Sequence, residues 1–370
     1  MKVRLGDYLE EFSLRNKADE DIPVYSVTNT QGFCRDYFGK EVASKDKSTY
    51  KIVPRGCFAY NPSRINVGSV DWQRNEDRVI VSPLYNVFKV DERLDTQYLY
   101  YFLKSDVALH LIRSAATGSV RDNLKFDMLC EFLINIPDIS EQKKMVSILD
   151  KNKGIIEMLN NNLAKLDELI KARFVEMFSD ESNMMKMSDI CSIITDGTHQ
   201  PPKFVTDGIP FIFVSNVVNN KLTYDAEKFI TQETYDELIK RTPIEIGDVL
   251  LSTVGSYGHP AVVKSDRKFL FQRHIAYLKP KKEIIDSNYL HGALLSPTAQ
   301  RQIEEGVKGI AQKTLNLSEI KKMVIPVPDL SKQKQFADFI DQVDKSKVAV
   351  QKALDETKLL FDSLMQEYFG

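Results

Sequence analysis

The stretch INIPDISEQKK at residues 134–144 returns as IPVPDLSKQKQ at residues 325–335. The offset between the two copies is 191, and other residue types coincide at it without a gap. The matching pairs are Pro137 and Pro328, Asp138 and Asp329, Ser140 and Ser331, Gln142 and Gln333, Tyr98 and Tyr289, Ser105 and Ser296, Leu124 and Leu315, and Gly56 and Gly247. A repeat of this length predicts one structural unit used twice, with a shared frame and altered loops.

Each copy has the same internal order of predicted elements. Short apolar runs rich in β-branched and aromatic residues come first, and they predict strands. The runs are IPVYSV, CFAY and LYNVFKV in the first copy, and IPFIFVSNVV, DVLLSTV and HIAYLKP in the second. Helices are predicted near 96–113 and 287–305, and a long helix closes each copy.

The two closing helices carry the clearest periodicity in the chain. Steps of four and three residues from Met145 and from Phe336 each visit ten positions, of which eight are apolar. The first set is Met145, Leu149, Asn152, Ile156, Leu159, Leu163, Leu166, Ile170, Arg173 and Met177, and the second is Phe336, Ile340, Val343, Lys347, Val350, Leu354, Thr357, Phe361, Leu364 and Tyr368. Such spacing is typical of a coiled-coil seam, although either stripe alone could instead pack on its own domain.

We therefore predict an α+β fold with a pseudo-twofold internal repeat. Two tandem α/β domains, residues 1–138 and 181–329, are separated and followed by long helices at 139–180 and 330–370. The helices are expected to pair as an antiparallel coiled coil. Ser140 and Ser331 are predicted N-caps, and about 36 helical residues would give a rod of about 54 Å.

Composition excludes several classes of protein. The chain has 370 residues, 43% of them hydrophobic and 28% charged, which indicates two to three globular domains and not a disordered chain. Four scattered cysteines and five unclustered histidines predict neither a disulfide framework nor a metal site. No apolar run is long enough to span a membrane, so we expect a cytoplasmic protein without membrane contact.

Motifs for catalysis are absent from the sequence. It has no glycine-rich dinucleotide or phosphate loop, no HExxH and no GxSxG. The tetrapeptide Asn61-Pro62-Ser63-Arg64 has some likeness to the Asn-Pro-Pro-aromatic motif of amino-methyltransferases, but it lacks the second proline and the aromatic residue. We interpret it as a turn after the CFAY strand.

Local charge is more informative than the net charge of −2. Residues 47–70 contain four basic residues and no acidic one, and residues 252–282 contain seven basic residues against Asp266 alone. The two stretches occupy corresponding positions of the repeat. Basic residues mixed with Asn, Ser, Tyr and His favour DNA binding, and a solvated basic face is the simpler alternative.

The order of domains and helices resembles the DNA-specificity (S) subunit of type I restriction-modification systems. PDISEQKK and PDLSKQKQ are similar to the start of that family's conserved helices, although Lys332 stands where Glu is usual. CFAYNPSRINVGSV at 57–70, GDVLLSTVGSYGHPAVV at 247–263 and DGTHQPPKFVTDGIPFIFVSNV at 196–217 resemble parts of its target recognition domains. TGSVRDNLK at 117–125 and KGIAQKTLN at 308–316 resemble the polar loop before the last strand of those domains.

The resemblance implies a noncatalytic subunit without a cofactor of its own. In that family, each target recognition domain reads one half of a split, asymmetric site on double-stranded DNA, and the helices set the gap. Two methyltransferase (M) subunits bind S-adenosylmethionine and methylate adenine N6, and restriction (R) subunits use ATP for cleavage in defence against foreign DNA. The alternatives are a stand-alone S-adenosylmethionine-dependent DNA methyltransferase and a coiled-coil assembly protein without DNA specificity.

Candidate contact residues fall into three groups. Base reading is expected from Asn61, Ser63, Arg64, Asn66, Arg121, His199, Gln200, Ser256, Tyr257, His259 and Gln312. Phosphate contacts are expected from Lys47, Arg74, Lys125, Lys203, Lys268, Arg273 and Lys313. Four apolar residues off the helical seam are expected to bind the M subunits, namely Met158, Leu169, Leu359 and Leu360.

Overall fold

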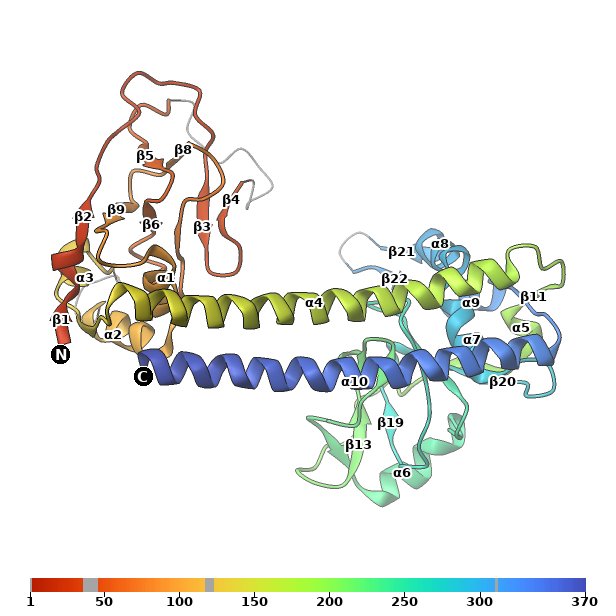
Figure 1. The fold of residues 1–370 in the computed structure, drawn as a ribbon. Helices are drawn as coiled ribbons and strands as arrows, with labels where there is room; N and C mark the ends of the chain where they lie inside the picture. Colours follow the sequence, from red (N-terminus) through yellow and green to blue (C-terminus); the bar gives the residue numbers. More distant parts are fainter. Residues whose placement is uncertain (1, 36–45, 117–122, 310–311) are drawn as a thin grey trace. The chain divides into compact units, whose positions relative to one another are not determined.

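A computed structural model describes residues 2–35, 46–116, 123–309 and 312–370. These residues form two compact units, which are described separately (Figure 1). Unit 1 comprises Met1–Leu159 and Ala353–Gly370, and unit 2 comprises Asn160–Lys352. Each unit therefore contains part of both long helices, α4 (Ile139–Phe178) and α10 (Leu330–Phe369).

Unit 1 is built on a four-stranded sheet of order β2-β9-β6-β7 whose neighbouring strands are antiparallel. Its strands are β1 (Lys2–Arg4), β2 (Leu9–Glu11), β3 (Ser26–Thr28), β4 (Gly32–Cys34), β5 (Lys51–Pro54), β6 (Phe58–Tyr60), β7 (Val70–Trp72), β8 (Arg78–Val81), β9 (Asn86–Val90) and β10 (Leu133–Asn135). Its helices besides α4 and α10 are η1 (Leu5–Tyr8), η2 (Ile65–Val67), α1 (Thr96–Lys104), α2 (Asp106–Ala116) and α3 (Phe126–Cys130).

Unit 2 repeats this plan with the sheet order β12-β20-β17-β18. Its strands are β11 (Met184–Lys186), β12 (Cys191–Asp196), β13 (Ile209–Ile212), β14 (Val217–Val218), β15 (Lys221–Leu222), β16 (Phe229–Ile230), β17 (Val249–Ser252), β18 (Pro260–Val262), β19 (Leu270–Phe271), β20 (Ile275–Pro280), β21 (Val307–Lys308), β22 (Thr314–Leu315) and β23 (Val324–Pro326). Its helices besides α4 and α10 are α5 (Met187–Ile190), η3 (Val214–Asn216), α6 (Gln232–Leu238), η4 (Ile239–Arg241), α7 (Ser287–Leu294), α8 (Pro297–Gly306) and α9 (Leu317–Lys322).

The main core of each unit joins the sheet to the long helices. In unit 1, Phe58 and Phe88 of the sheet share a buried cluster with Leu149 of α4 and Phe369 of α10. In unit 2, Phe174 and Phe178 of α4 lie 5.4 and 5.6 Å from Phe336 of α10, measured between ring centroids. Burial of these large aromatic side chains is the dominant force that fixes each sheet to its helices.

Each of the twenty predicted seam positions is buried or half-buried. In unit 2 the helices run antiparallel, since Phe174 meets Phe336 whereas the earlier Asp167 pairs with the later Lys347. This ion pair neutralises the charge of Lys347, which occupies a position of the otherwise apolar seam. The predicted fold class, two tandem α/β domains with two long helices, is confirmed.

Two details differ from the sequence predictions. Ser140 is not the N-cap of α4, because the helix begins at Ile139 and the carboxylate of Asp138 accepts the backbone N–H groups of Ser140 and Glu141 at 2.9 and 3.0 Å. In the second repeat α10 begins at Leu330, so Asp329, and not Ser331, precedes its first residue.

The helical stretches predicted near 96–113 and 287–305 each consist of two helices that meet at the matched serines. Ser105 stands between α1 and α2, where its hydroxyl accepts the backbone N–H of Ala108 at 3.2 Å. Ser296 does the same for Ala299 between α7 and α8, also at 3.2 Å. A serine hydroxyl that satisfies a free N–H group at a helix start favours a new helix over continuation of the previous one.

Candidate nucleic-acid interface

Two loops lie side by side in unit 1, although sixty residues separate them in the chain. The backbone N–H of Leu124 donates to the carbonyl oxygen of Pro62 at 3.1 Å, and Ser63 Oγ lies 2.6 Å from Asn123 Oδ1. The turn after β6 is thereby tied to the segment before α3. Both loops were predicted from the sequence to carry contact residues.

Unit 2 joins the equivalent loops in the same way. The backbone N–H of Leu315 donates to the carbonyl oxygen of Thr253 at 2.8 Å. At the offset of 191, Leu315 corresponds to Leu124 and Thr253 corresponds to Pro62. Val254 and Thr314 also form an antiparallel bridge. We call this arrangement, residues 61–67 with 123–125 in unit 1 and residues 253–259 with 312–315 in unit 2, the two-loop platform.

In unit 1 the predicted base-reading residues lie on or next to the turn after β6. Asn61 Oδ1 accepts the backbone N–H of Ser63 at 3.0 Å, which stabilises the predicted Asn-Pro turn. The Arg64 side chain is exposed, and the backbone carbonyl of Asn66 accepts a bond from Arg113 Nε at 3.3 Å. Arg121 lies outside the described residues.

In unit 2 the platform carries Tyr257, His259, Gln312 and the exposed Ser256. Tyr257 donates its hydroxyl to Glu304 at 3.0 Å, and the Lys313 ammonium lies 5.9 Å from the centroid of the Tyr257 ring. His259 Nδ1 lies 3.1 Å from Asn220 Oδ1. The platform therefore presents a basic side chain on an aromatic surface, an arrangement suited to phosphates and base edges.

A polar pocket of about 410 Å³ lies beside this platform. It brings together two predicted residues, Arg273 and Gln312, and its lining also includes Asp196, His274 and Asn316. Burial, followed by the charge of Arg273, lowers the pKa of His274, so this imidazole is held neutral around pH 7. A neutral imidazole can both donate and accept hydrogen bonds.

At this pocket, Asp196 holds two side chains that could face a ligand. Its carboxylate accepts from Arg241 at 2.6 Å and from the predicted His199 at 2.9 Å. Asp196 and Arg241 were not predicted as site residues. Asp196 opens the family-like stretch 196–217, but Arg241 lies 45 positions later and outside every quoted motif. Gln200, the neighbour of His199, is exposed.

The predicted phosphate contacts are found in varied surroundings. Lys125, Lys203 and Arg273 are exposed, and Lys47 is half-buried. Lys268 is held by Gln232 Oε1 at 3.2 Å and lies 5.5 Å from the Tyr235 ring centroid, so it is not near the polar pocket residues named above. A cation already held by neutral groups keeps its charge for a phosphate.

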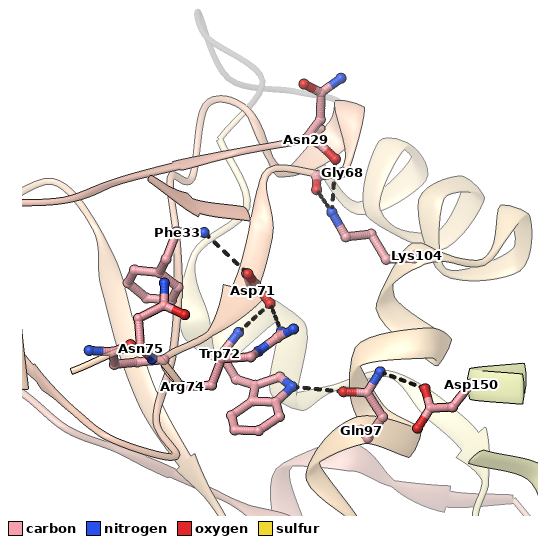
Figure 2. A network of polar contacts seen from close by, with 11 residues as sticks. Asn29, Phe33, Gly68, Asp71, Trp72, Arg74, Asn75, Gln97, Lys104 and Asp150 are labelled. Atoms are coloured by element: carbon pink, nitrogen blue, oxygen red, sulfur yellow. Dashed lines mark hydrogen bonds and ion pairs between the residues drawn. The ribbon is translucent and has the colours of Figure 1, made fainter. Parts of the chain in front are cut away.

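Arg74 lies in a dense network within unit 1 (Figure 2). It pairs with the carboxylate of Asp71 and lies 4.5 Å from the Trp72 ring and 5.5 Å from the Tyr100 ring. Asp71 also accepts the backbone N–H of Phe33 at 3.1 Å, which attaches β4 to β7. Arg74 therefore has a clear structural role, whatever its contact with DNA.

The four predicted partner-binding residues are exposed on the long helices. The exposed fractions are 53% for Met158, 46% for Leu169, 69% for Leu359 and 51% for Leu360. They lie off the seam, as the periodicity predicts. Apolar side chains at this exposure on helices of this length offer contact area to another protein.

The described residues contain no group of histidine, cysteine, aspartate and glutamate side chains that could hold a metal ion. All four cysteines are free. Among the described helices, none is long and apolar enough to cross a membrane.

Comparison with known proteins identifies sequence relatives along most of the chain. The sequence model of the family described as "Type I restriction modification DNA specificity domain" matches residues 2–168 and 179–357. The EcoBI specificity subunit of a type I restriction enzyme from Escherichia coli is 28% identical over 89% of this chain and 78% of its own length. The MjaVIII specificity subunit of Methanocaldococcus jannaschii is 20% identical over 92% of this chain and 85% of its own length.

Solved structures share the fold. A chain from a study of complex assembly and conformational transition in the type I R-M system aligns with a TM-score of 0.61 and 17% identity, over 100% of this chain and 97% of that one. The S subunit of a type I system from M. genitalium aligns with a TM-score of 0.53 and 14% identity, over 100% and 96% of the two chains.

Proposed function

The chain belongs to the type I restriction-modification DNA-specificity family, and we propose that each of its units reads one half of a divided DNA site through its two-loop platform. As a specificity subunit it is the noncatalytic component that recognises DNA, and it assembles with other subunits of the restriction-modification system. Chemistry on the DNA belongs to those partners.

The repeated platform is the observation that carries the proposal. The bonds from Leu124 to Pro62 and from Leu315 to Thr253 hold the same two loops together in both units. The residues on the loops nevertheless differ, with Ser63 and Arg64 in unit 1 and Val254 and Gly255 at the matching positions of unit 2. A common frame with different side chains suits two readers of different half-sites, so the whole site is expected not to be palindromic.

In unit 2, Arg241 of η4 contacts Asp196 of the pocket beside the platform, and we propose that it reads a guanine next to the platform. Its guanidinium is oriented by Asp196, and a fixed Arg fork can donate two hydrogen bonds to O6 and N7 of guanine in the major groove. Arg273, which lines the pocket, and Lys313, which lies over the Tyr257 ring of the platform, supply positive charge for phosphates. Losing Arg241 is therefore expected to relax preference at one base pair, whereas losing Lys313 weakens binding to every sequence.

Two M subunits are the proposed partners on the exposed faces of α4 and α10. These subunits would carry S-adenosylmethionine and methylate adenine N6, and ATP would belong to R subunits where these join the complex. The base to be methylated must leave the duplex to be reached, and that step is assigned to the M subunits. No cofactor is proposed for this chain.

The two half-sites are expected to be separated by a gap of fixed length. Each long helix has 40 residues, which gives about 60 Å of rigid spacer. Half-site centres about 34–36 Å apart would let both units meet the same face of the duplex.

Methylation mapping tests the proposal directly. The chain and its M subunit are expressed in a host without other methyltransferases, and methylated adenines are located across the genome. We expect one asymmetric, two-part motif with a constant gap. The Arg241→Ala variant should lose its base preference at one position of one half-site only. A continuous palindrome, a variable gap, or methyl transfer by the purified chain alone would contradict the proposal, the last in favour of a stand-alone methyltransferase. Equal, weak binding to any duplex would favour an assembly protein without DNA specificity.

A further inference from the structure

The largest pocket described in unit 2 matches in part a pocket of about 450 Å³ in unit 1, which is lined by Tyr100 and Lys153, but it extends beyond that pocket to the place where unit 1 has Trp72 and Arg74. The unit 2 pocket has a volume of about 590 Å³ and opens where β18 and α7 meet the long helices. Strand pairing shows which residues of the two units correspond. Phe58 and Val249 match at the offset of 191, and Trp72 of β7 pairs with Phe58 as Val262 of β18 pairs with Val249. Val262 thus stands where unit 1 has Trp72.

The other members of the unit 1 network are replaced in the same way. In unit 1, Arg74 lies against the Trp72 and Tyr100 rings. Trp72 Nε1 donates to Gln97 Oε1 at 3.0 Å (Figure 2). The matching residues that line the pocket are Lys264 for Arg74, His291 for Tyr100 and Asn288 for Gln97. A bicyclic ring and a phenol ring have been exchanged for valine and imidazole. The space of a flat two-ring group is therefore open in unit 2.

An unpartnered polar atom points to a missing ligand in this space. The hydroxyl of Tyr224, a residue that lines the pocket, is buried and has no hydrogen-bond partner among the described residues. Ser265 lies near it without meeting the geometry of a hydrogen bond. An unsatisfied buried hydroxyl is unfavourable, because it has lost its bonds to water, and a ligand that bonds to it would remove that cost.

The charges of the lining indicate an acidic ligand. Five lysines line the pocket against three aspartates, and the aspartates are already engaged: Asp344 with Lys221 at 3.3 Å, Asp341 with Lys264 at 3.8 Å, and Asp167 with Lys347. Within the described part of the chain, Lys345 has no ion-pair partner and its side chain is exposed. An ammonium group free at the rim suits a phosphate or carboxylate.

We propose that this pocket binds a purine nucleotide. The flat bicyclic base would occupy the space that the Trp72 indole fills in unit 1, with its polar edge on Asn288 and the Tyr224 hydroxyl, and the phosphate would face Lys345. The volume lies within the 300–1,000 Å³ range of small-molecule sites. The proposal does not depend on which DNA sequence the platforms read.

The test measures binding of adenosine 5′-monophosphate to the full-length chain by calorimetry, with adenosine and ribose 5-phosphate as partial probes. We expect one molecule per chain with a Kd of about 1 mM or tighter, weaker binding of adenosine, and none of ribose 5-phosphate. Val262→Trp should abolish binding, because it restores the indole of unit 1. Absence of adenosine 5′-monophosphate binding to the folded chain overturns the proposal.

Two charge substitutions on α10 test the same pocket in a second way, which applies even if the Val262→Trp variant does not fold. Lys345→Glu should weaken adenosine 5′-monophosphate about tenfold while leaving adenosine unchanged. Lys334→Glu, an exposed lysine of the same helix outside the pocket lining, is the matched control and should change neither. Binding that survives Val262→Trp and Lys345→Glu unchanged overturns the assignment to this pocket.

The source of the nucleotide is decided by competition. A single-stranded oligonucleotide that displaces adenosine 5′-monophosphate would identify the natural ligand as a nucleotide within a strand. Failure of the strand to displace it would identify a free nucleotide. Both outcomes support the pocket chemistry, and neither bears on double-stranded DNA recognition by the platforms.

Discussion

The side-chain oxygen of Gln142 accepts the backbone N–H of Asp95 at 2.7 Å, and this bond ties the start of α4 to the start of α1. The amide nitrogen of Gln142 donates to the carbonyls of Arg93 and Pro137 at 3.0 and 2.9 Å. In unit 2, Gln333 makes the same three bonds, to Asp286, Ile284 and Pro328, at 2.8, 3.0 and 2.7 Å. Both glutamines are fully buried, which explains why this residue recurs in the two copies.

Replacement of Gln142 by alanine should destabilise unit 1. It would leave one N–H and two carbonyl groups without partners in a buried place, and each such group costs about 1–3 kcal/mol. Allowing for relaxation, we expect a loss of about 2–4 kcal/mol in the free energy of unfolding, measured by urea denaturation. Glu141→Ala is the matched control, because Glu141 is the exposed neighbour and should change stability by less than about 0.5 kcal/mol. Equal effects of the two substitutions would contradict this role.

Polar substitution of Met158, Leu169, Leu359 and Leu360 should prevent assembly with the M subunits without unfolding the chain. Their side chains are about half exposed or more, so the free chain loses little on substitution by serine. Co-purification and the thermal midpoint would be measured together. Leu149→Ser is the control, since this fully buried residue should reduce stability instead. A large fall in the midpoint of the exposed-site variants would mean that these residues pack within the chain.

Arg74 and Lys125 were predicted to have the same role, and the structure separates them. Arg74→Ala should lower stability by about 2–3 kcal/mol, because it removes the stack on Trp72 and leaves the Asp71 carboxylate unpaired. Lys125→Ala should leave stability unchanged and reduce the salt dependence of DNA affinity by about one unit of slope. Denaturation and binding at several salt concentrations distinguish the two, and an unchanged stability of Arg74→Ala would refute the structural role.

Stability should fall as the pH decreases from 7 to 5, and His291 should contribute to the fall. Burial is the main cause that lowers the pKa of His291, Lys264 and Lys347 lower it further, and the Asn220 carbonyl and Asp344 oppose the shift. The unfolded chain therefore takes up a proton near pH 6.5 before the folded chain does, which favours unfolding at acidic pH. His291→Tyr, which installs the residue of the first repeat, should flatten this dependence in thermal unfolding. The same pH profile in variant and parent would contradict the assignment.

The long helices could be predicted from the sequence because their signal is local and repeated. A seam visible every three or four residues over 40 positions needs no knowledge of distant contacts. The capping residue was assigned wrongly because Asp138 and Ser140 are both good N-caps, and only the bonds from Asp138 to two backbone N–H groups decide between them. The Lys332 that departs from the family pattern is exposed, whereas the adjacent Gln333 carries the structural contacts.

The site could be predicted only in outline. Loop positions followed from the matched glycines, and the structure does place the two loops of each repeat together. The partnership of Asp196 with Arg241 could not be predicted, because no pattern links residues on β12 and η4 before the chain folds. A basic residue in a sequence also does not reveal whether it is free, as Lys125 is exposed while Arg74 is stacked on aromatic rings.

The separation of the glutamine contacts from the two-loop platforms has an evolutionary consequence. The bonds of Gln142 and Gln333 involve only backbone groups and the helix starts, so they place no demand on the side chains of the platform loops. Mutations at the exposed positions of those loops can therefore accumulate without loss of the scaffold, whereas the buried Ile65, Leu124 and Leu315 are part of the cores. If the platforms read DNA as proposed, a change confined to the exposed residues of those loops would alter the target sequence and leave the glutamine contacts in place.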